Sequence, residues 1–476
     1  MKKILFAASE ALPFAASGGL GDVIGSLPAA IKQTEKDCDI RVIMPLYDKV
    51  GEKYRARMEK VLETTVTLGW RNQYCGLYSL EENGVIYYFI DNEYYYKRGT
   101  LYGEGDDGER FAFFCKAVVD LMPLIGFFPD YLHAHDWQAA LSVVYLKCLY
   151  SDRPEYKDIK TVFTIHNIQY QGIYDLYNMG DLLGLHEKYA PVLEFNGCMN
   201  FMKGALVCAD MISTVSPTYA KEILTPEYSH GLHYVLEMCR GKLTGILNGI
   251  DREYYNPAKD GELVCNFSYM RPAGKKECKK SLQEYLSLPV RENVPMVVMI
   301  TRLVSHKGLD IVKDSLYNLL EDDIQFVLLG TGDYEYERFF EEAAYRFPEK
   351  MRTLLKYDKE LSKRIYAAGD IFLMPSLSEP CGLAQMISSR YGTVPVVRET
   401  GGLYDSIRDN GWEGGGNGFT FAPYTGMELY GAVKRALNLY NNNKPEWEKL
   451  TLKVMRFDFS WKKSAKLYIQ MYERLN

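Results

Sequence analysis

A single carboxylate, Glu379, stands where a polar loop follows an apolar segment, and its chemistry would be to bind or orient a ligand. Residues 371–374 form an apolar run typical of a buried parallel strand, and Pro375 ends it. Gly382 permits a tight turn before the predicted helix at residues 383–390. Ligands bind at this carboxyl edge of the strands in open α/β sheets. An isolated glutamate in a loop is more often solvated, but a helix start that can face an anion favours a binding site.

Two cations, Arg302 and Lys307, occupy another loop that follows a predicted strand. They lie close together in sequence, so both can reach the same oxyanions. With helix N-termini beside them, two cations form a diphosphate site that needs no metal. Glycines follow the ends of two further predicted strands in this half of the chain, at Gly332 and at Gly401 and Gly402.

A glycine-rich segment near the N-terminus, residues 17–23 (SGGLGDV), separates a predicted strand from a helical stretch. Its glycine spacing does not match GxGxxG, so a dinucleotide site is poorly supported. The physical use of such a loop is close approach of the backbone to a ligand at a helix N-terminus. Asp22 has two interpretations: it stabilises the first helical turn through the helix dipole, or it binds a substrate hydroxyl.

Polar residues also end two later strands of the first half. His135 and Asp136 end one strand, and His166 and Asn167 end the next. A histidine at a strand end is more often a hydrogen-bonded structural residue than a catalyst. Two such ends at one sheet edge would gather polar groups there, which favours a functional role.

The order of strands and helices predicts how these residues are positioned. Short strands alternate with helices of ten or more residues in both halves, which indicates parallel sheets. Three alternating segments, 61–68, 76–80 and 85–90, predict an antiparallel excursion. Asn248-Gly249 is a turn signal at which the pattern restarts. We therefore predict an α/β fold with two doubly wound, Rossmann-like domains facing a cleft, the first at residues 1–245.

Composition excludes several classes of protein. A chain of 476 residues suits two domains or three, and a net charge of −6 gives no electrostatic signature for nucleic acid. No apolar run approaches the ~20 residues that span a bilayer. The ten cysteines form no CxxC and no zinc-finger spacing, which predicts reduced thiols in a cytoplasmic protein. Without GxSxG or HExxH, a serine hydrolase and a zinc enzyme are both disfavoured.

Eight motifs in order along the chain resemble the bacterial glycogen synthase and plant starch synthase family, and they span nearly its whole length. They are SGGLGDV (17–23), HAHDW (133–137), TIHN (164–167), LNGID (247–251), Arg302 with KGL (307–309), GTGD (330–333), EPCGL (379–383) and TGGL (400–403).

This resemblance implies a retaining GT-B glucosyltransferase that moves glucose from ADP-glucose to the non-reducing 4-hydroxyl of an α-1,4-glucan. The domain at residues 1–245 would serve the acceptor, residues 246–456 the donor, and a helix within residues 457–476 would pack back on the first domain. The expected partners are a nucleotide sugar and glycogen, with no nucleic acid, no membrane, no cofactor and no metal. The sequence does not indicate an oligomeric state.

The resemblance also assigns roles to residues. Asp22 and His166 would line the reacting centre, Arg302 and Lys307 would stabilise the diphosphate as the bond breaks, and Glu379 would orient the glucose. A covalent nucleophile role for Glu379 stays open. The donor-binding residues would be Ser17, Gly18, Gly19, Asn248 (on glucose hydroxyls), Gly332, Tyr357 (on the nucleobase), Cys381, Gly382, Leu383, Gly401 and Gly402, and the acceptor-binding residues Tyr102, Asp136 and Trp137.

Two residues depart from the family pattern near the donor. The family usually has lysine where this chain has Ser17, and often threonine where it has Ala384. A charged hydrogen bond contributes roughly 1.5–3 kcal/mol, so the lost cation should weaken donor binding. UDP-glucose therefore stays an alternative donor, and a catalytically idle glucan-binding protein is a second alternative. A lipid or small acceptor is a third, although no basic amphipathic surface helix is evident.

Overall fold

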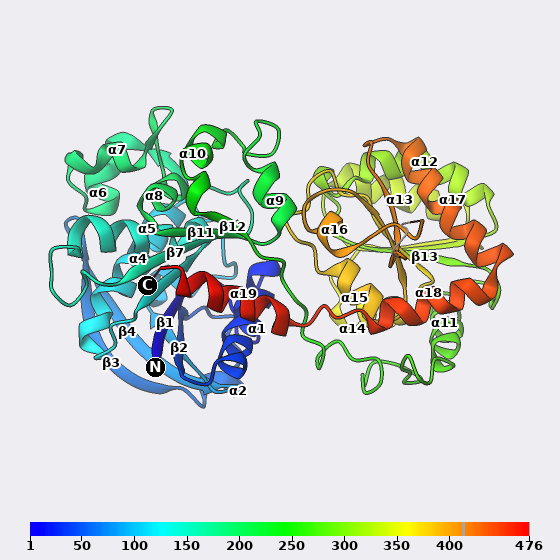
Figure 1. The fold of residues 1–476 in the computed structure, drawn as a ribbon, viewed down its shortest axis with the longest axis horizontal. Helices are drawn as coiled ribbons and strands as arrows, with labels where there is room; N and C mark the ends of the chain where they lie inside the picture. Colours follow the sequence, from blue (N-terminus) through cyan, green and yellow to red (C-terminus); the bar gives the residue numbers. More distant parts are fainter. Residues whose placement is uncertain (412–414, 476) are drawn as a thin grey trace. The chain divides into compact units, whose positions relative to one another are not determined.

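The computed structural model describes residues 1–411 and 415–475, and its chain divides into two compact units (Figure 1). Unit 1 comprises residues 1–249 and 461–476, and unit 2 comprises residues 250–460. Each limit lies four residues after the predicted one (249 against 245, and 460 against 456).

Unit 1 is built on a nine-stranded sheet with the order β12-β11-β7-β6-β1-β2-β5-β4-β3. Its strands are β1 (Lys2–Ala7), β2 (Cys38–Pro45), β3 (Glu59–Leu68), β4 (Arg71–Glu82), β5 (Val85–Asp91), β6 (Tyr131–His135), β7 (Lys160–Ile165), β11 (Met211–Thr214) and β12 (Leu243–Gly245). A separate three-stranded sheet contains β8 (Ile173–Asp175), β9 (Glu194–Phe195) and β10 (Cys198–Asn200).

The helices of unit 1 are α1 (Gly19–Thr34), α2 (Glu52–Arg55), α3 (Glu93–Tyr96), α4 (Asp107–Leu124), α5 (Asp136–Tyr145), α6 (Met179–Leu183), α7 (Ala190–Leu193), α8 (Phe201–Cys208), α9 (Pro217–Glu222), α10 (His233–Met238) and α19 (Trp461–Glu473). The antiparallel excursion is confirmed, because β4 pairs antiparallel with both β3 and β5. The remaining pairs of the large sheet, including β2 with β5, are parallel.

Unit 2 has a six-stranded parallel sheet with the order β15-β14-β13-β16-β17-β18. Its strands are β13 (Met296–Ile300), β14 (Gln325–Leu329), β15 (Met351–Leu354), β16 (Ile371–Met374), β17 (Val394–Arg398) and β18 (Phe419–Phe421). Its helices are α11 (Gly274–Tyr285), α12 (Leu309–Glu321), α13 (Tyr334–Arg346), α14 (Lys359–Ala368), α15 (Ala384–Arg390), α16 (Gly401–Ser406), α17 (Gly426–Asn442) and α18 (Lys444–Arg456).

Helices cover both faces of the unit 2 sheet, with α12 and α13 on one side and α11, α14 and α15 on the other (Figure 1). Strands covered in this way are apolar on both faces, and every residue of β14 is buried. This double cover is why short continuous apolar runs, rather than alternating ones, signalled the strands of this half.

Strand order reverses once within each parallel region, and the reversal shows where a ligand can bind. In unit 1 the chain proceeds from β1 to β2 on one side and to β6 on the other, and in unit 2 it proceeds from β13 to β14 and to β16. Loops leave in opposite directions from such a point and open a crevice beyond the strand ends. The loops and helix starts that follow β1, β6, β13 and β16 carry most of the predicted site residues.

The last helix, α19, belongs to unit 1 although the chain reaches it after unit 2. It packs beside α1 (Figure 1). Trp461, Ala465, Tyr468 and Tyr472 recur at helical spacing and are all buried, so they form the packed face of the helix. Among the described residues, no helix has the length and apolar character needed to cross a membrane.

Candidate active site

The loops after β13 and β16 meet at one edge of the unit 2 sheet. Lys307 Nζ lies 2.7 Å from Glu379 Oε2, and Ser376 Oγ donates a hydrogen bond to the same oxygen at 2.9 Å. The backbone N–H of Leu377 donates to the carbonyl oxygen of His306 at 3.0 Å, which ties the two loops together. Glu379 is only 6% exposed. The structure thus brings together the cation and the carboxylate that the sequence placed 72 residues apart.

Glycines allow the loops after β16 and β17 to approach closely. Gly382 has φ +71° and Gly401 has φ +43°, a region that favours glycine. A Cβ at Gly401 would overlap the carbonyl oxygen of Glu379, and a Cβ at Gly402 would overlap that of Cys381. The N–H of Gly402 donates to the Glu379 carbonyl at 3.1 Å. Internal packing therefore already requires these glycines, and their predicted contact with a donor stays a prediction.

The loop after β13 carries a positive charge that has no side-chain partner among the described residues. Arg302 is exposed, and its guanidinium makes no hydrogen bond or ion pair within residues 1–411 and 415–475. His306 lies between the two cations in sequence, and burial, followed by the charge of Lys307, lowers its pKa to about 4. Its ring is neutral at pH 7. Arg302 is therefore available to an anion beside the Lys307–Glu379 pair.

The other predicted donor residues of unit 2 lie on neighbouring loops. Gly332 follows β14. It forms a β-bridge with Leu303, so it lies beside the loop after β13. Tyr357 follows β15, and its side chain is 80% exposed, which leaves the ring free to stack on a base. Leu383, half-buried, directly precedes α15.

Glu10 organises the glycine-rich loop of unit 1, and sequence reasoning missed it. Its carboxylate accepts hydrogen bonds from Ser17 N (2.6 Å), Ser17 Oγ (2.7 Å) and Gly18 N (3.2 Å). Tyr102 OH donates to it at 2.6 Å and also bonds Ser9 Oγ at 2.7 Å. The missed signal is the one that marked Glu379, an acidic residue just beyond an apolar strand. The Tyr102 hydroxyl holds this loop together, and its role in acceptor binding stays a prediction.

The fold of the protein does not require glycine at positions 18 and 19. Both are exposed, neither has positive φ, and a Cβ built on either meets no atom within 4 Å. By contrast, a Cβ on Gly25 would lie 2.5 Å from the carbonyl oxygen of Leu12. The first pair is therefore suited to leave room for a ligand, whereas Gly25 is needed for packing.

Gly19→Ala is expected to leave folding intact and to weaken catalysis. Alanine at the start of α1 should add about 0.5 kcal/mol of stability through lower backbone entropy in the unfolded chain. A methyl group in the ligand's space should lower kcat/KM by about tenfold or more. Steady-state kinetics and thermal unfolding measure the two effects. Gly25→Ala is the control and should lower stability; unchanged kinetics in Gly19→Ala would contradict the ligand role.

Asp136 fixes the backbone at the end of β7. Its Oδ1 accepts hydrogen bonds from His166 N at 2.7 Å and Asn167 N at 3.3 Å. Burial raises the pKa of Asp136 to about 7, and the two backbone donors oppose the rise. Asp136 itself has φ +56°, an uncommon value outside glycine. In the structure it supports His166, and its contact with an acceptor stays a prediction.

Trp137 is 9% exposed and packs among aromatic rings. Its ring lies 5.2 Å from that of Phe111 and 6.3 Å from those of Tyr174 and Phe201. This packing is enough to explain why Trp137 is buried here. Its contact with an acceptor stays a prediction.

Asp22 lies half-buried in the first turn of α1, so both interpretations of it stay open.

Asn248 and His166 offer polar atoms that the protein does not fully use. Asn248 is 6% exposed, and its Oδ1 is buried with no hydrogen-bond partner among the described residues. His166 bonds His135 through Nε2, and its Nδ1 makes no hydrogen bond in the described part of the chain. Burial lowers the pKa of His166 to about 3, so its ring is neutral at pH 7.

Acid is expected to destabilise the protein through His166. Its pKa is about 3 when folded and about 6.5 when unfolded, so the unfolded state binds the proton first as the pH falls. The stabilisation from His166 is fully present above its pKa in the unfolded state. It is lost as the pH falls toward its pKa in the folded state. Between pH 7.5 and pH 5 this loss is about 2 kcal/mol.

Urea unfolding at these two pH values tests the effect. His166→Asn should lose about 2 kcal/mol less than the wild type over this range. His186→Asn, at an exposed histidine, should match the wild type. The raised pKa of Asp136 acts in the opposite direction, since its protonated form is favoured in the folded state, and it is common to all three proteins. Equal pH dependence in His166→Asn and wild type would contradict the shift.

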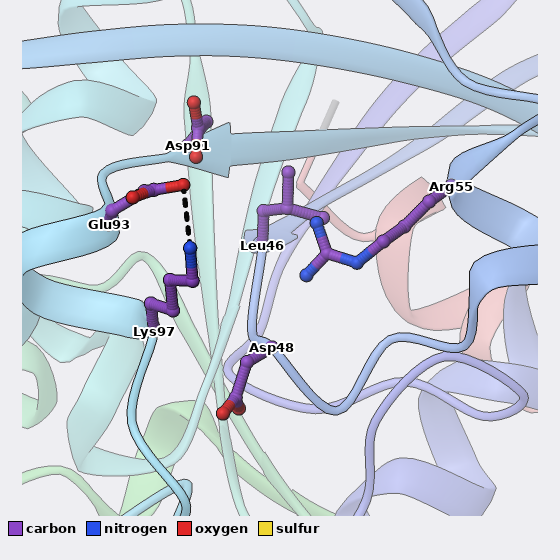
Figure 2. A pocket seen from close by; sticks show the side chains of 6 residues that line it. All are labelled: Leu46, Asp48, Arg55, Asp91, Glu93 and Lys97. Carbon is purple, nitrogen blue, oxygen red and sulfur yellow. Dashed lines mark hydrogen bonds and ion pairs between the residues drawn. The ribbon is translucent and has the colours of Figure 1, made fainter.

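Unit 1 has a hollow of about 290 Å³ away from the predicted site residues. It is lined by Leu46, Asp48, Arg55, Asp91, Glu93 and Lys97 (Figure 2). Glu93 and Lys97 form an ion pair across 3.2 Å. None of its lining residues was predicted to act in catalysis or binding.

The described residues contain no group of three or more His, Cys, Asp or Glu side chains placed to hold a metal ion, and all ten cysteines are free.

Known proteins match the chain over almost its full length. The family described as starch synthase catalytic domain matches residues 3–238, and that described as glycosyl transferases group 1 matches residues 286–450. The glycogen synthase of Geobacillus thermodenitrificans (strain NG80-2) is 47% identical over 476 residues, covering 99% of this chain and 98% of that protein. The glycogen synthase of Alkaliphilus metalliredigens (strain QYMF) is 46% identical over 476 residues, covering 99% and 100%.

Solved structures agree with this match. The catalytic domain of starch synthase IV from Arabidopsis thaliana, bound to ADP and acarbose, has a TM-score of 0.92 and 36% identity, covering 100% of this chain and 99% of its own. Sucrose-phosphate synthase from Thermosynechococcus elongatus, with a TM-score of 0.62, 15% identity and coverage of 100% and 99%, shares the fold. The predicted α/β architecture of two doubly wound domains is confirmed as GT-B. The chain belongs to the bacterial glycogen synthase and plant starch synthase family of glycosyltransferases.

Proposed function

We propose that this protein is a glycogen synthase that transfers glucose, with retention, from ADP-glucose to the non-reducing 4-hydroxyl of an α-1,4-glucan. The observation that carries the proposal is the Lys307–Glu379 pair at the strand-order reversal of unit 2, with the unpaired Arg302 on the same loop. The ADP bound to the similar starch synthase supports ADP-glucose as the donor.

The cations of unit 2 would act on the leaving group. As the bond from glucose to diphosphate breaks, negative charge grows on the diphosphate oxygens. Arg302 and Lys307 both follow β13 and would meet that charge, and preorganised charge of this kind lowers the barrier without rearrangement. Arg302 would do so without giving up an ion pair to any described residue.

Glu379 would hold the sugar. Lys307 and Ser376 occupy its Oε2, whereas Oε1 makes no hydrogen bond among the described residues. A carboxylate fixed through one oxygen presents the other to glucose hydroxyls in a defined direction. This arrangement supports orientation of the glucose by Glu379.

Unit 1, taken by itself, also has polar atoms suited to the oxygens of a sugar. The free Oδ1 of Asn248 can accept a hydrogen bond from a hydroxyl, and the free Nδ1 of His166 can contact another oxygen. The exposed backbone of Gly18 and Gly19 leaves room for the donor. We further propose that the reaction needs no cofactor and no metal, since the two cations supply the positive charge.

A donor panel tests the proposal. Purified protein is incubated with glycogen and ADP-, UDP- or GDP-glucose, with and without EDTA, and released nucleoside diphosphate and chain length are measured. We expect release of ADP and longer chains, unchanged by EDTA. Preference for UDP-glucose would overturn the donor, loss of activity with EDTA would overturn metal independence, and glycogen binding without release from any donor would favour the idle protein.

A further inference from the structure

Two buried histidines, His135 and His166, connect the core of unit 1 to the candidate site. His135 ends β6 and is 0% exposed, and its Nδ1 lies 2.9 Å from Nε2 of His166. His166 keeps 9% of its surface exposed. Because Nε2 of His166 is used by His135, Nδ1 is the ring nitrogen left to meet a ligand.

The hydrogen bond between the two rings contains one proton, and the ring that donates it decides what His166 can do. Burial lowers the pKa of both rings below the usual range, so each is neutral and carries one N–H at pH 7. Either His135 Nδ1–H donates to His166, which leaves His166 protonated at Nδ1, or His166 Nε2–H donates to His135. The two arrangements present opposite hydrogen-bonding character to a ligand.

The far side of His135 distinguishes the two arrangements. Its Nε2 is buried and has no hydrogen-bond partner in the described part of the chain. If His166 were the donor, this nitrogen would carry a buried N–H with nothing to accept it. If His135 is the donor, only a lone pair is left unused. Buried N–H groups without an acceptor are the rarer of the two defects, so His135 is the donor.

Packing keeps the His135 ring in this orientation. It stacks on Phe6 with centroids 5.4 Å apart and on His133 at 4.1 Å. His133 makes different bonds, with Nδ1 2.7 Å from Tyr472 OH and Nε2 2.5 Å from Thr164 Oγ1. Phe6 and His133 also lie 4.9 Å from each other, so the three rings form one cluster. Packing in this cluster supports the ring orientation in which Nδ1 of His135 faces His166.

We propose that His135 is a positioning residue that holds His166 in its Nδ1–H tautomer, so that His166 donates a hydrogen bond to an oxygen of the bound sugar. In this tautomer the exposed nitrogen has no lone pair, and His166 does not remove the proton from the attacking hydroxyl. The inference rests on the proposed function for the identity of the ligand, but the tautomer is a property of the protein alone.

Nitrogen NMR of the ligand-free, full-length protein tests the tautomer directly. The chain has seven histidines, so ring-¹⁵N labelling gives seven imidazole patterns that single substitutions assign. We expect the proton of His166 on Nδ1, the form that free histidine disfavours. A His166 proton on Nε2 would overturn the inference, whether or not the protein transfers glucose.

Three variants test the consequence for catalysis. His135→Asn keeps an N–H donor at the place of Nδ1, His135→Leu removes it, and His186→Asn is the control at an exposed histidine with no bond to His135 or His166. Loss of one hydrogen bond should lower kcat/KM about tenfold in His135→Leu, with the other two within about threefold of wild type. Equal losses in His135→Asn and His135→Leu would assign His135 to packing alone.

Discussion

Lys307→Ala is expected to lower kcat by about 10²–10³-fold, the loss that follows removal of one preorganised group from a developing negative charge. The substitution removes a cation placed for the diphosphate, and it also leaves Glu379, 6% exposed, without its ion-pair partner. Both effects act in the reaction itself, so kcat should fall more than KM rises. Steady-state release of ADP with glycogen as the primer measures both constants.

A lysine in the following helix, α12, provides the control. Lys313 pairs with Glu335 at 2.7 Å, the same distance as the Lys307–Glu379 pair, but Glu335 is largely exposed. Lys313→Ala should leave kcat within about twofold, because exposed ion pairs contribute ~1 kcal/mol or less to stability. If Lys307→Ala turned over as fast as Lys313→Ala, the diphosphate site would have to lie elsewhere.

The sheet of unit 2 could be predicted from sequence because its strands are buried on both faces. The predicted strand at residues 371–374 coincides with β16, and the predicted helix at 383–390 differs by one residue from α15. Parallel order then places every strand end at one edge, so Lys307 and Glu379 could be expected to meet. Topology accounts for the two loops lying at one edge, whereas the 2.7 Å contact depends on the side-chain positions.

The interactions around Glu10 could not be predicted in the same way. Nothing in the local pattern says that its carboxylate turns back onto Ser17 and Gly18, or that Tyr102, 92 residues away, joins it. Such contacts depend on how a loop folds over a strand end. Trp137 shows the same limit, because the motif that contains it does not reveal that Phe111 and Phe201 pack around its ring.

Glu379→Gln is expected to lower kcat about 10²–10³-fold, as truncating one partner of a buried charge pair typically does, while the fold survives. Glutamine keeps the size of the side chain and one oxygen, but it leaves Lys307 without a counter-charge and weakens the grip on the glucose. Circular dichroism and thermal unfolding check the fold. Glu335→Gln, at the exposed partner of Lys313, is the matched control and should retain wild-type turnover.

The same position separates the two roles that a carboxylate can play here. If Glu379 formed a glucosyl ester, Glu379→Ala would accept azide in its place, and mass spectrometry of the wild type quenched during turnover would find one added glucose. We expect neither, because Lys307 and Ser376 hold one oxygen of Glu379 and leave the other to orient a hydroxyl. A trapped glucosyl–Glu379 ester would replace orientation by covalent catalysis, and it would account for retention through two displacements at the anomeric carbon.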